Sequence, residues 1–118
     1  MRVASHETLA ELAPDRRGRV REAGVVFPDY LIHEESIEEP KREYWLRTVS
    51  SLKPGVTELY IHPAKASDAL KQMTSYWHVR ADEYKLFTND PKMLAVLKKH
   101  DVKLIGWRAL RDLQRGER

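Results

Sequence analysis

The chain of 118 residues is 42% hydrophobic and 33% charged, which is typical of a folded domain and excludes an intrinsically disordered chain. It contains no cysteine, so disulfide bridges and thiolate metal sites are excluded. Its net charge of +3 comes from basic residues that alternate with acidic ones, whereas nucleic-acid binding favours a concentrated basic stripe. We therefore expect a single domain over residues 1–118 that does not bind nucleic acid.

The first half of the chain predicts short helices, one strand and one longer helix. Residues 7–12 and 15–22 have the pattern of short helical segments, which Pro14 separates. The apolar run AGVVFPDYLI contains a predicted strand at Val25–Phe27, because a proline after it fits the end or edge of a strand. An acidic loop then leads to PKREYWLRTVSSL at residues 40–52, where apolar side chains recur at helical spacing.

The second half predicts two more strands and several helices. They are, in order, a strand within residues 55–64, helices at 67–77, 81–87 and 90–100, a buried strand at 102–107 and a closing helix at 108–115. Ser67 is placed to cap one helix, and Asp90 followed by Pro91 is a strong signal for the start of another. The order of elements predicts an α/β fold with about three parallel strands and flanking helices.

The stretch GVTELYIHPA is the most informative part of the sequence. Glu58, Tyr60 and His62 lie on one face of the predicted strand, because successive side chains alternate between its two faces. His62 is at the carboxyl end of the strand, where parallel α/β folds place their active sites, and Pro63 turns the chain away there. A histidine at this position could act as a general acid or base, or it could cap the strand by bonding to a neighbouring loop. For Glu58 the simpler interpretation is a buried structural partner, for example of an arginine.

Three parallel strands form too small a sheet to cover a polar inner face, and parallel sheets are normally buried on both sides. We therefore expect the chain either to be the C-terminal part of a longer protein or to complete its sheet with a second copy, as a homo-oligomer.

Several segments of the chain together resemble the C-terminal half of the YdjC-like carbohydrate deacetylases, the family that includes chitooligosaccharide and hopanoid-linked sugar deacetylases. They are VVFPDYL, LKPGVTELYIHPA, WHVRADEY and FTNDPKMLAVLKKHDVKLIGWRAL, and the resemblance covers residues 24–113. It implies a partial β/α barrel and an enzyme that hydrolyses the N-acetyl groups of amino sugars with a divalent metal, Mg or Zn.

The resemblance also implies roles for three residues. His62 matches the histidine of the family's His-Pro motif, which implies that it donates a proton to the departing amine. Asp29 matches an aspartate near the pocket, and Arg80 matches the arginine of a Trp-x-x-Arg motif, which implies that both take part in substrate binding. For Arg80, an ion pair on the helix surface is an equally open interpretation.

The sequence departs from the family in its metal ligands. Family members bind the metal through an Asp-Asp stretch and through histidines that include a His-x-His, and neither motif occurs in this chain. The histidines other than His62 have no partner at ligand spacing, so we expect solvated side chains; they are His6, His33, His78 and His100. We therefore expect no metal site, no cofactor and no deacetylase activity in this chain alone, and binding of an amino sugar once a metal-bearing half completes it. The alternative is a non-catalytic assembly or interaction module derived from the same fold.

No run of about 18 apolar residues predicts a membrane span, and the segment MRVASHETLAEL lacks the apolar core of a signal peptide. We expect a cytoplasmic protein with no membrane partner.

Overall fold

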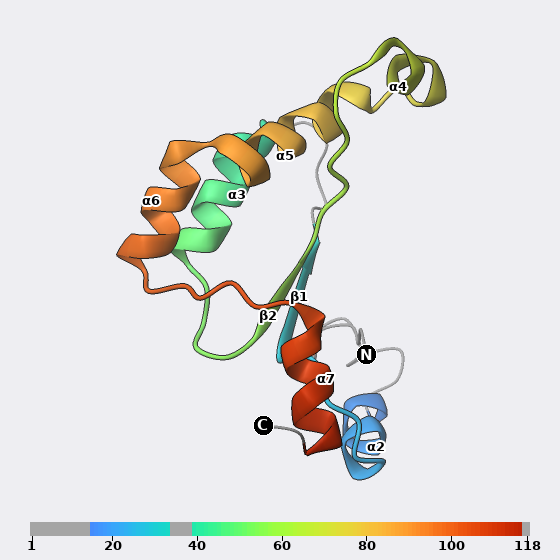
Figure 1. Ribbon diagram of the computed structural model, residues 1–118, viewed down its shortest axis with the longest axis vertical. Coiled ribbons are helices and arrows are strands. Elements are labelled where there is room, and N and C mark those ends of the chain that lie inside the picture. Colours follow the sequence, from blue (N-terminus) through green and yellow to red (C-terminus); the bar gives the residue numbers. More distant parts are fainter. Residues whose placement is uncertain (1–14, 34–38, 117–118) are drawn as a thin grey trace. The chain divides into compact units, whose positions relative to one another are not determined.

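The computed structural model describes residues 15–33 and 39–116, and Figure 1 shows their helices and strands. In chain order the elements are α2 (Arg16–Glu22), β1 (Tyr30–His33), α3 (Lys41–Ser50), β2 (Thr57–Tyr60), α4 (Asp68–Met73), α5 (Trp77–Asn89), α6 (Pro91–Lys99) and α7 (Trp107–Arg115). The two strands are parallel neighbours in one sheet, so the described part of the chain has a helix-rich α/β fold. Among the described helices, none has the length and apolar character needed to cross a membrane. The helix predicted at residues 7–12 lies outside the described residues.

The chain forms two compact units. The described residues of unit 1 fall within Met1–Ile32, Pro54–Leu59 and Leu104–Arg118, and those of unit 2 fall within His33–Lys53 and Tyr60–Lys103. Each unit therefore combines segments that are distant in the sequence, and each is described separately below.

The core of unit 2 lies between α3, α5 and α6, which pack side by side (Figure 1). Trp45 of α3 is fully buried, and its ring makes edge-on contacts with Tyr44 and Phe87 at centroid distances of 4.9 and 5.8 Å. The buried residues of this core are Lys41, Trp45, Leu46, Val49, Ala81, Glu83, Leu86 and Met93. The helical pattern predicted for residues 40–52 is confirmed by α3, which directs Trp45 and Val49 inward.

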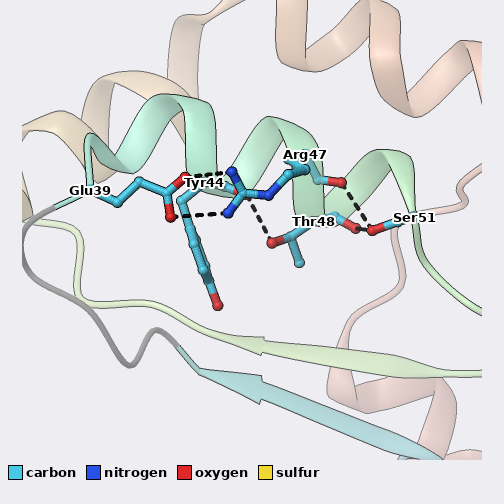
Figure 2. Close-up of polar contacts among 5 residues, drawn as sticks. All are labelled: Glu39, Tyr44, Arg47, Thr48 and Ser51. Carbon is cyan, nitrogen blue, oxygen red and sulfur yellow. Dashed lines mark hydrogen bonds and ion pairs between the residues drawn. The ribbon is translucent and has the colours of Figure 1, made fainter.

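The outer side of α3 carries polar contacts (Figure 2). The Arg47 guanidinium pairs with both carboxylate oxygens of Glu39, with an Nη2–Oε2 distance of 3.0 Å. This hydrogen bonding holds the pKa of Glu39 below its ordinary value and raises the pKa of Arg47. The Thr48 hydroxyl donates to the Tyr44 carbonyl one turn earlier, at 2.8 Å. Since the ion pair between Arg47 and Glu39 is exposed to water, it contributes little to the stability of the fold.

Asp90 joins α5, α6 and α3. It is the C-cap of α5 and the N-cap of α6. Its Oδ1 accepts a hydrogen bond from the Lys92 amide at 2.9 Å, and Pro91 occupies the first turn of α6. The predicted start of this helix is therefore confirmed. Its Oδ2 accepts from Nε of Arg42 on α3 at 2.6 Å. This pairing, supported by the amide bond, lowers the pKa of Asp90 and raises that of Arg42.

In unit 1, the segment that leads into β2 at Gly55 lies against Asp29 and Tyr30 at the start of β1. The Tyr30 amide donates to the Val56 carbonyl at 3.1 Å, and the Val56 amide donates to Oδ2 of Asp29 at 2.8 Å. Gly55 has a φ of +124°, and a Cβ added there would lie 2.8 Å from the same Asp29 oxygen. Both the conformation and the close approach therefore require glycine at this position.

The strand predicted at Val25–Phe27 is wrong, and the strand lies instead after Pro28, at β1. The Val26 amide donates to the side chain of Gln114 at 3.0 Å and not to a neighbouring strand. Pro28 is buried but has no amide proton, so the ladder begins only beyond it. The helix predicted at residues 15–22 is confirmed by α2.

The strand predicted at residues 102–107 is also wrong. Residues 102–106 form no regular element, and the Val102 amide donates to the Leu97 carbonyl at the end of α6. Leu104 and Ile105 are 78% and 55% exposed, so they are not part of the core that the described residues form. The closing helix is confirmed by α7, which begins at Trp107.

The helix predicted at residues 67–77 is divided into two. Ser67 caps α4 as expected, since its hydroxyl accepts the Leu70 amide at 3.1 Å. The backbone is extended at Thr74, however, and Trp77 begins α5. Met73 is 81% exposed, so the apolar side expected for this helix is not buried.

Candidate functional site

The site in unit 2 is built around the segment that follows β2, residues 61–66, which forms no regular element. The strand ends at Tyr60, and His62 lies two residues beyond it, immediately before Pro63. The rings of Tyr60 and His62 contact each other with a centroid distance of 4.6 Å and a tilt of 52°. This contact agrees with the prediction that the two side chains lie on the same face.

Two hydrogen bonds hold this segment against α5. The His62 amide donates to Oε2 of Glu83 at 2.6 Å, and the Ala64 amide donates to the main-chain carbonyl of Arg80 at 3.0 Å. Pro63 lies between these two anchored amides, and its ring restricts φ. The backbone that carries the imidazole is therefore fixed from both sides.

Glu83 connects the segment after β2 to the core. It is 1% exposed, and its second oxygen, Oε1, accepts from Nε1 of Trp45 at 2.9 Å. Both carboxylate oxygens thus have donors, as a buried carboxylate requires. The sequence interpretation did not single out Glu83, although its position three residues before Leu86 and four before Phe87 places it on the inner face of α5.

Arg80 is half-buried on α5 and is one helical turn before Glu83. A pair of opposite charges at this spacing commonly interacts, but Glu83 is engaged by Trp45 and by the His62 amide. Within residues 15–33 and 39–116, the Arg80 guanidinium has no hydrogen-bond or ion-pair partner. The surface ion pair considered for Arg80 is therefore absent from the described residues, and its donors can serve a ligand.

These side chains surround a pocket of about 230 Å³ that lies entirely within unit 2. Its lining residues are His33, Tyr60, His62, Tyr76, Val79, Arg80 and Glu83. The pocket thus combines two aromatic rings, two imidazoles and a guanidinium, a mixture of apolar walls and a few polar groups that is common in binding sites for small molecules. The structure brings His62 and Arg80, both predicted site residues, to one pocket.

Asp29 is in unit 1 and is not among the residues that line this pocket. Its Oδ2 accepts the Val56 amide at 2.8 Å, so its observed contact stabilises the segment before β2. A part in substrate binding, which the family resemblance implies for Asp29, stays a prediction.

The other described histidines, His33, His78 and His100, do not form a cluster with acidic side chains of the described residues. His33 is exposed and also lines the pocket, which the sequence did not indicate, whereas His78 and His100 are exposed and lie outside it. His6 lies outside the described residues. No group of three or more histidine, cysteine, aspartate or glutamate side chains comes together in the part of the chain that the structure describes. Those residues therefore do not fit a divalent-metal site, which needs several such ligands.

Comparison with known proteins gives no match to a family model, to a curated protein or to a solved structure.

Proposed function

We propose that this chain is the C-terminal portion of a metal-dependent carbohydrate N-deacetylase and that its pocket holds an amino sugar. The observation that carries the proposal is the joint lining of one pocket by His62 and Arg80, which lie in two separate motifs of the family resemblance. In this proposal the two parallel strands and their helices represent part of a β/α barrel.

The pocket has suitable chemistry for an acetylated sugar. The rings of Tyr60 and Tyr76, which are 40% and 48% exposed, offer apolar surfaces to the faces of a pyranose. The Arg80 guanidinium has several N–H donors and no acceptor, so it binds a ligand oxygen such as a hydroxyl or the acetamide carbonyl.

His62 supplies the proton in this proposal. In this hydrolysis a water oxygen bonds to the acetamide carbonyl carbon and releases a proton to the solvent. The C–N bond then breaks to give acetate, and the nitrogen keeps the electron pair and receives a proton from the His62 imidazolium, which becomes neutral imidazole and is protonated again from the solvent. Histidine suits this step because its charge changes near neutral pH. The described residues do not fit a metal site, so no step is assigned here to a metal, and the chain alone is expected to release no acetate.

Titration of the isotopically labelled chain with N,N′-diacetylchitobiose, followed by NMR, tests the proposal. We expect the signals of His62, Arg80 and Tyr76 to shift, and Arg80→Ala to weaken binding at least about tenfold through the loss of charged hydrogen bonds. Matched controls are Arg108→Ala and His100→Ala, which change the same residue types outside the pocket. Shifts that spread over the surface, or no shifts at millimolar sugar, would contradict the proposal.

A second candidate function, assembly with another copy of the chain, is favoured by apolar side chains that the fold leaves exposed. Leu104, Ile105 and Leu113 of unit 1 are 78%, 55% and 67% exposed, and such residues mark interaction surfaces when they are contiguous. Sedimentation of the chain and of Leu113→Glu tests this function. A concentration-dependent dimer that Leu113→Glu dissociates would support it, and a monomer at all concentrations would exclude it.

A further inference from the structure

We infer that Glu83 is a positioning residue, which fixes the peptide of His62 and thereby aims its imidazole at the pocket. The inference rests on the proposed function for what the imidazole does there, whereas the contacts that carry it are independent of any ligand. It concerns a residue that lies outside the motif positions to which a role has been assigned.

The His62 amide lies beyond the end of the sheet. β2 ends at Tyr60, so the ladder gives no partner to this amide, and Pro63 has no amide to contribute. A side-chain acceptor must therefore bind the His62 amide in place of a neighbouring strand if the segment after β2 is to keep one conformation. Oε2 of Glu83 provides it at 2.6 Å, a short distance that is typical of a charged acceptor.

The acceptor that Glu83 provides is rigid. Glu83 is 1% exposed, and Oε1 is held by Nε1 of Trp45, a side chain that is fully buried. The Glu83 carboxylate is therefore held between the segment after β2 and the core. It cannot rotate without leaving the buried Nε1 donor of Trp45 unsatisfied. The position of His62 is consequently transmitted from the packing of Trp45.

The fixed backbone in turn orients the imidazole. The Ala64 amide bonds to the Arg80 carbonyl, so the chain is anchored on both sides of Pro63. The His62 ring then contacts the Tyr60 ring at 4.6 Å, which restricts its side-chain torsions. A preorganised proton donor needs this kind of supporting contact, because small displacements reduce the rate of a positioned reaction.

Hydrogen exchange and ring contacts measured by NMR test the inference without any sugar. In the unchanged protein we expect slow exchange of the His62 amide and a nuclear Overhauser effect between the Tyr60 and His62 rings. Glu83→Gln replaces one acceptor by a donor, so exchange of the His62 amide should accelerate about ten- to a hundredfold and the ring contact should be lost. Asp82→Asn, the same change at an exposed neighbour on α5, should leave both signals unchanged.

Trp45→Phe separates positioning from general stability, because it removes the Nε1 donor and keeps an aromatic core. The His62 amide should remain slower to exchange in Trp45→Phe than in Glu83→Gln. Fast exchange of this amide in the unchanged protein would overturn the inference, even if Glu83→Gln fails to fold. Equal acceleration of all amides of α3, α5 and α6 in Glu83→Gln would also overturn it, by assigning Glu83 a purely structural role.

The outcome for the proposed function is read separately. If the chain does not bind the chitobiose but Glu83 protects the His62 amide, the function fails and the inference stands. If the unchanged protein binds the chitobiose but its His62 amide is unprotected, the inference fails and the function stands.

Discussion

The helices α5 and α7 show opposite relations between sequence pattern and burial. In α7, Trp107, Leu110 and Leu113 recur on one side, yet the helix has no buried residue. In α5 the inner side includes a glutamate, yet the helix buries Ala81 and Leu86 together with that Glu83.

A packing partner, and not the sequence pattern alone, decides which helix face is buried. Helix α5 packs on α3, whose Trp45 offers both an apolar ring and an N–H donor, so even a carboxylate can be accommodated on its inner side. In α7, Leu113 remains 67% exposed. An amphipathic pattern therefore predicts which face would be buried but does not show that the described residues cover it.

The largest test of this comparison replaces a tryptophan in each region. Trp45→Ala should reduce the free energy of unfolding by about 3–5 kcal/mol, because it leaves a large cavity in the core. Trp107→Ala should reduce the free energy of unfolding by less than about 1 kcal/mol, because Trp107 is 47% exposed. Chemical denaturation measures both values. Similar losses for the two variants would show that α7 is buried in solution.

The next test compares two neighbouring carboxylates of α5. Glu83→Ala leaves the donors of Trp45 and of the His62 amide without acceptors, and should cost about 2–4 kcal/mol in the free energy of unfolding. Asp82→Ala changes an exposed carboxylate and should have an effect within about 0.5 kcal/mol. If the two substitutions are equally tolerated in urea denaturation, the buried network does not stabilise unit 2.

A third test asks whether unit 1 depends on backbone geometry where unit 2 depends on its core. Gly55→Ala forces an alanine into φ +124° and towards Oδ2 of Asp29. We expect the stability of unit 1 to fall by about 1–2 kcal/mol. Hydrogen exchange of the Tyr30 amide measures this loss. Gly18→Ala is the control, because an added Cβ meets nothing within 4 Å at this site. Equal exchange in both variants would show that the segment at Gly55 is not strained.

The smallest effect concerns the pH dependence of the contact between α3 and α6. Arg42 lowers the pKa of Asp90, so the folded protein holds this carboxylate ionised at a lower pH than the unfolded chain does. The resulting stability is fully present above the ordinary pKa of aspartate, about 4, and is lost as the pH falls through the lowered value. Asp90→Asn should flatten this part of the acid unfolding curve. An unchanged curve would mean that the pair does not form in solution.

Local signals made much of the fold predictable. The Asp-Pro start of α6, the Ser67 cap of α4 and the inward positions of Trp45 and Val49 follow from interactions within a few residues, and each is confirmed. The strand expected at residues 102–107 failed because apolar composition does not provide a neighbouring strand. Its first amide, that of Val102, is taken by the end of α6 instead.

For the candidate site, His62 was predicted from its place at the end of a strand, and Arg80 was assigned from the family resemblance. Both residues line one pocket, with Arg80 on α5, the second helix after β2, and their roles there stay predictions. Glu83 was missed because its partner Trp45 is 38 residues away, and nothing in the local sequence shows that contact. Asp29 stays assigned by resemblance, since its observed contact is with the Val56 amide.

The single residue shared by α5 and α6 has a consequence for how this sequence can vary in length. Asp90 ends one helix and caps the next, so no spacer residue exists between them. Inserting one residue would separate the end of α5 from the start of α6 and displace α6, with its buried Met93, relative to the core. Relatives that retain this helix pair should therefore rarely gain or lose a position at the junction.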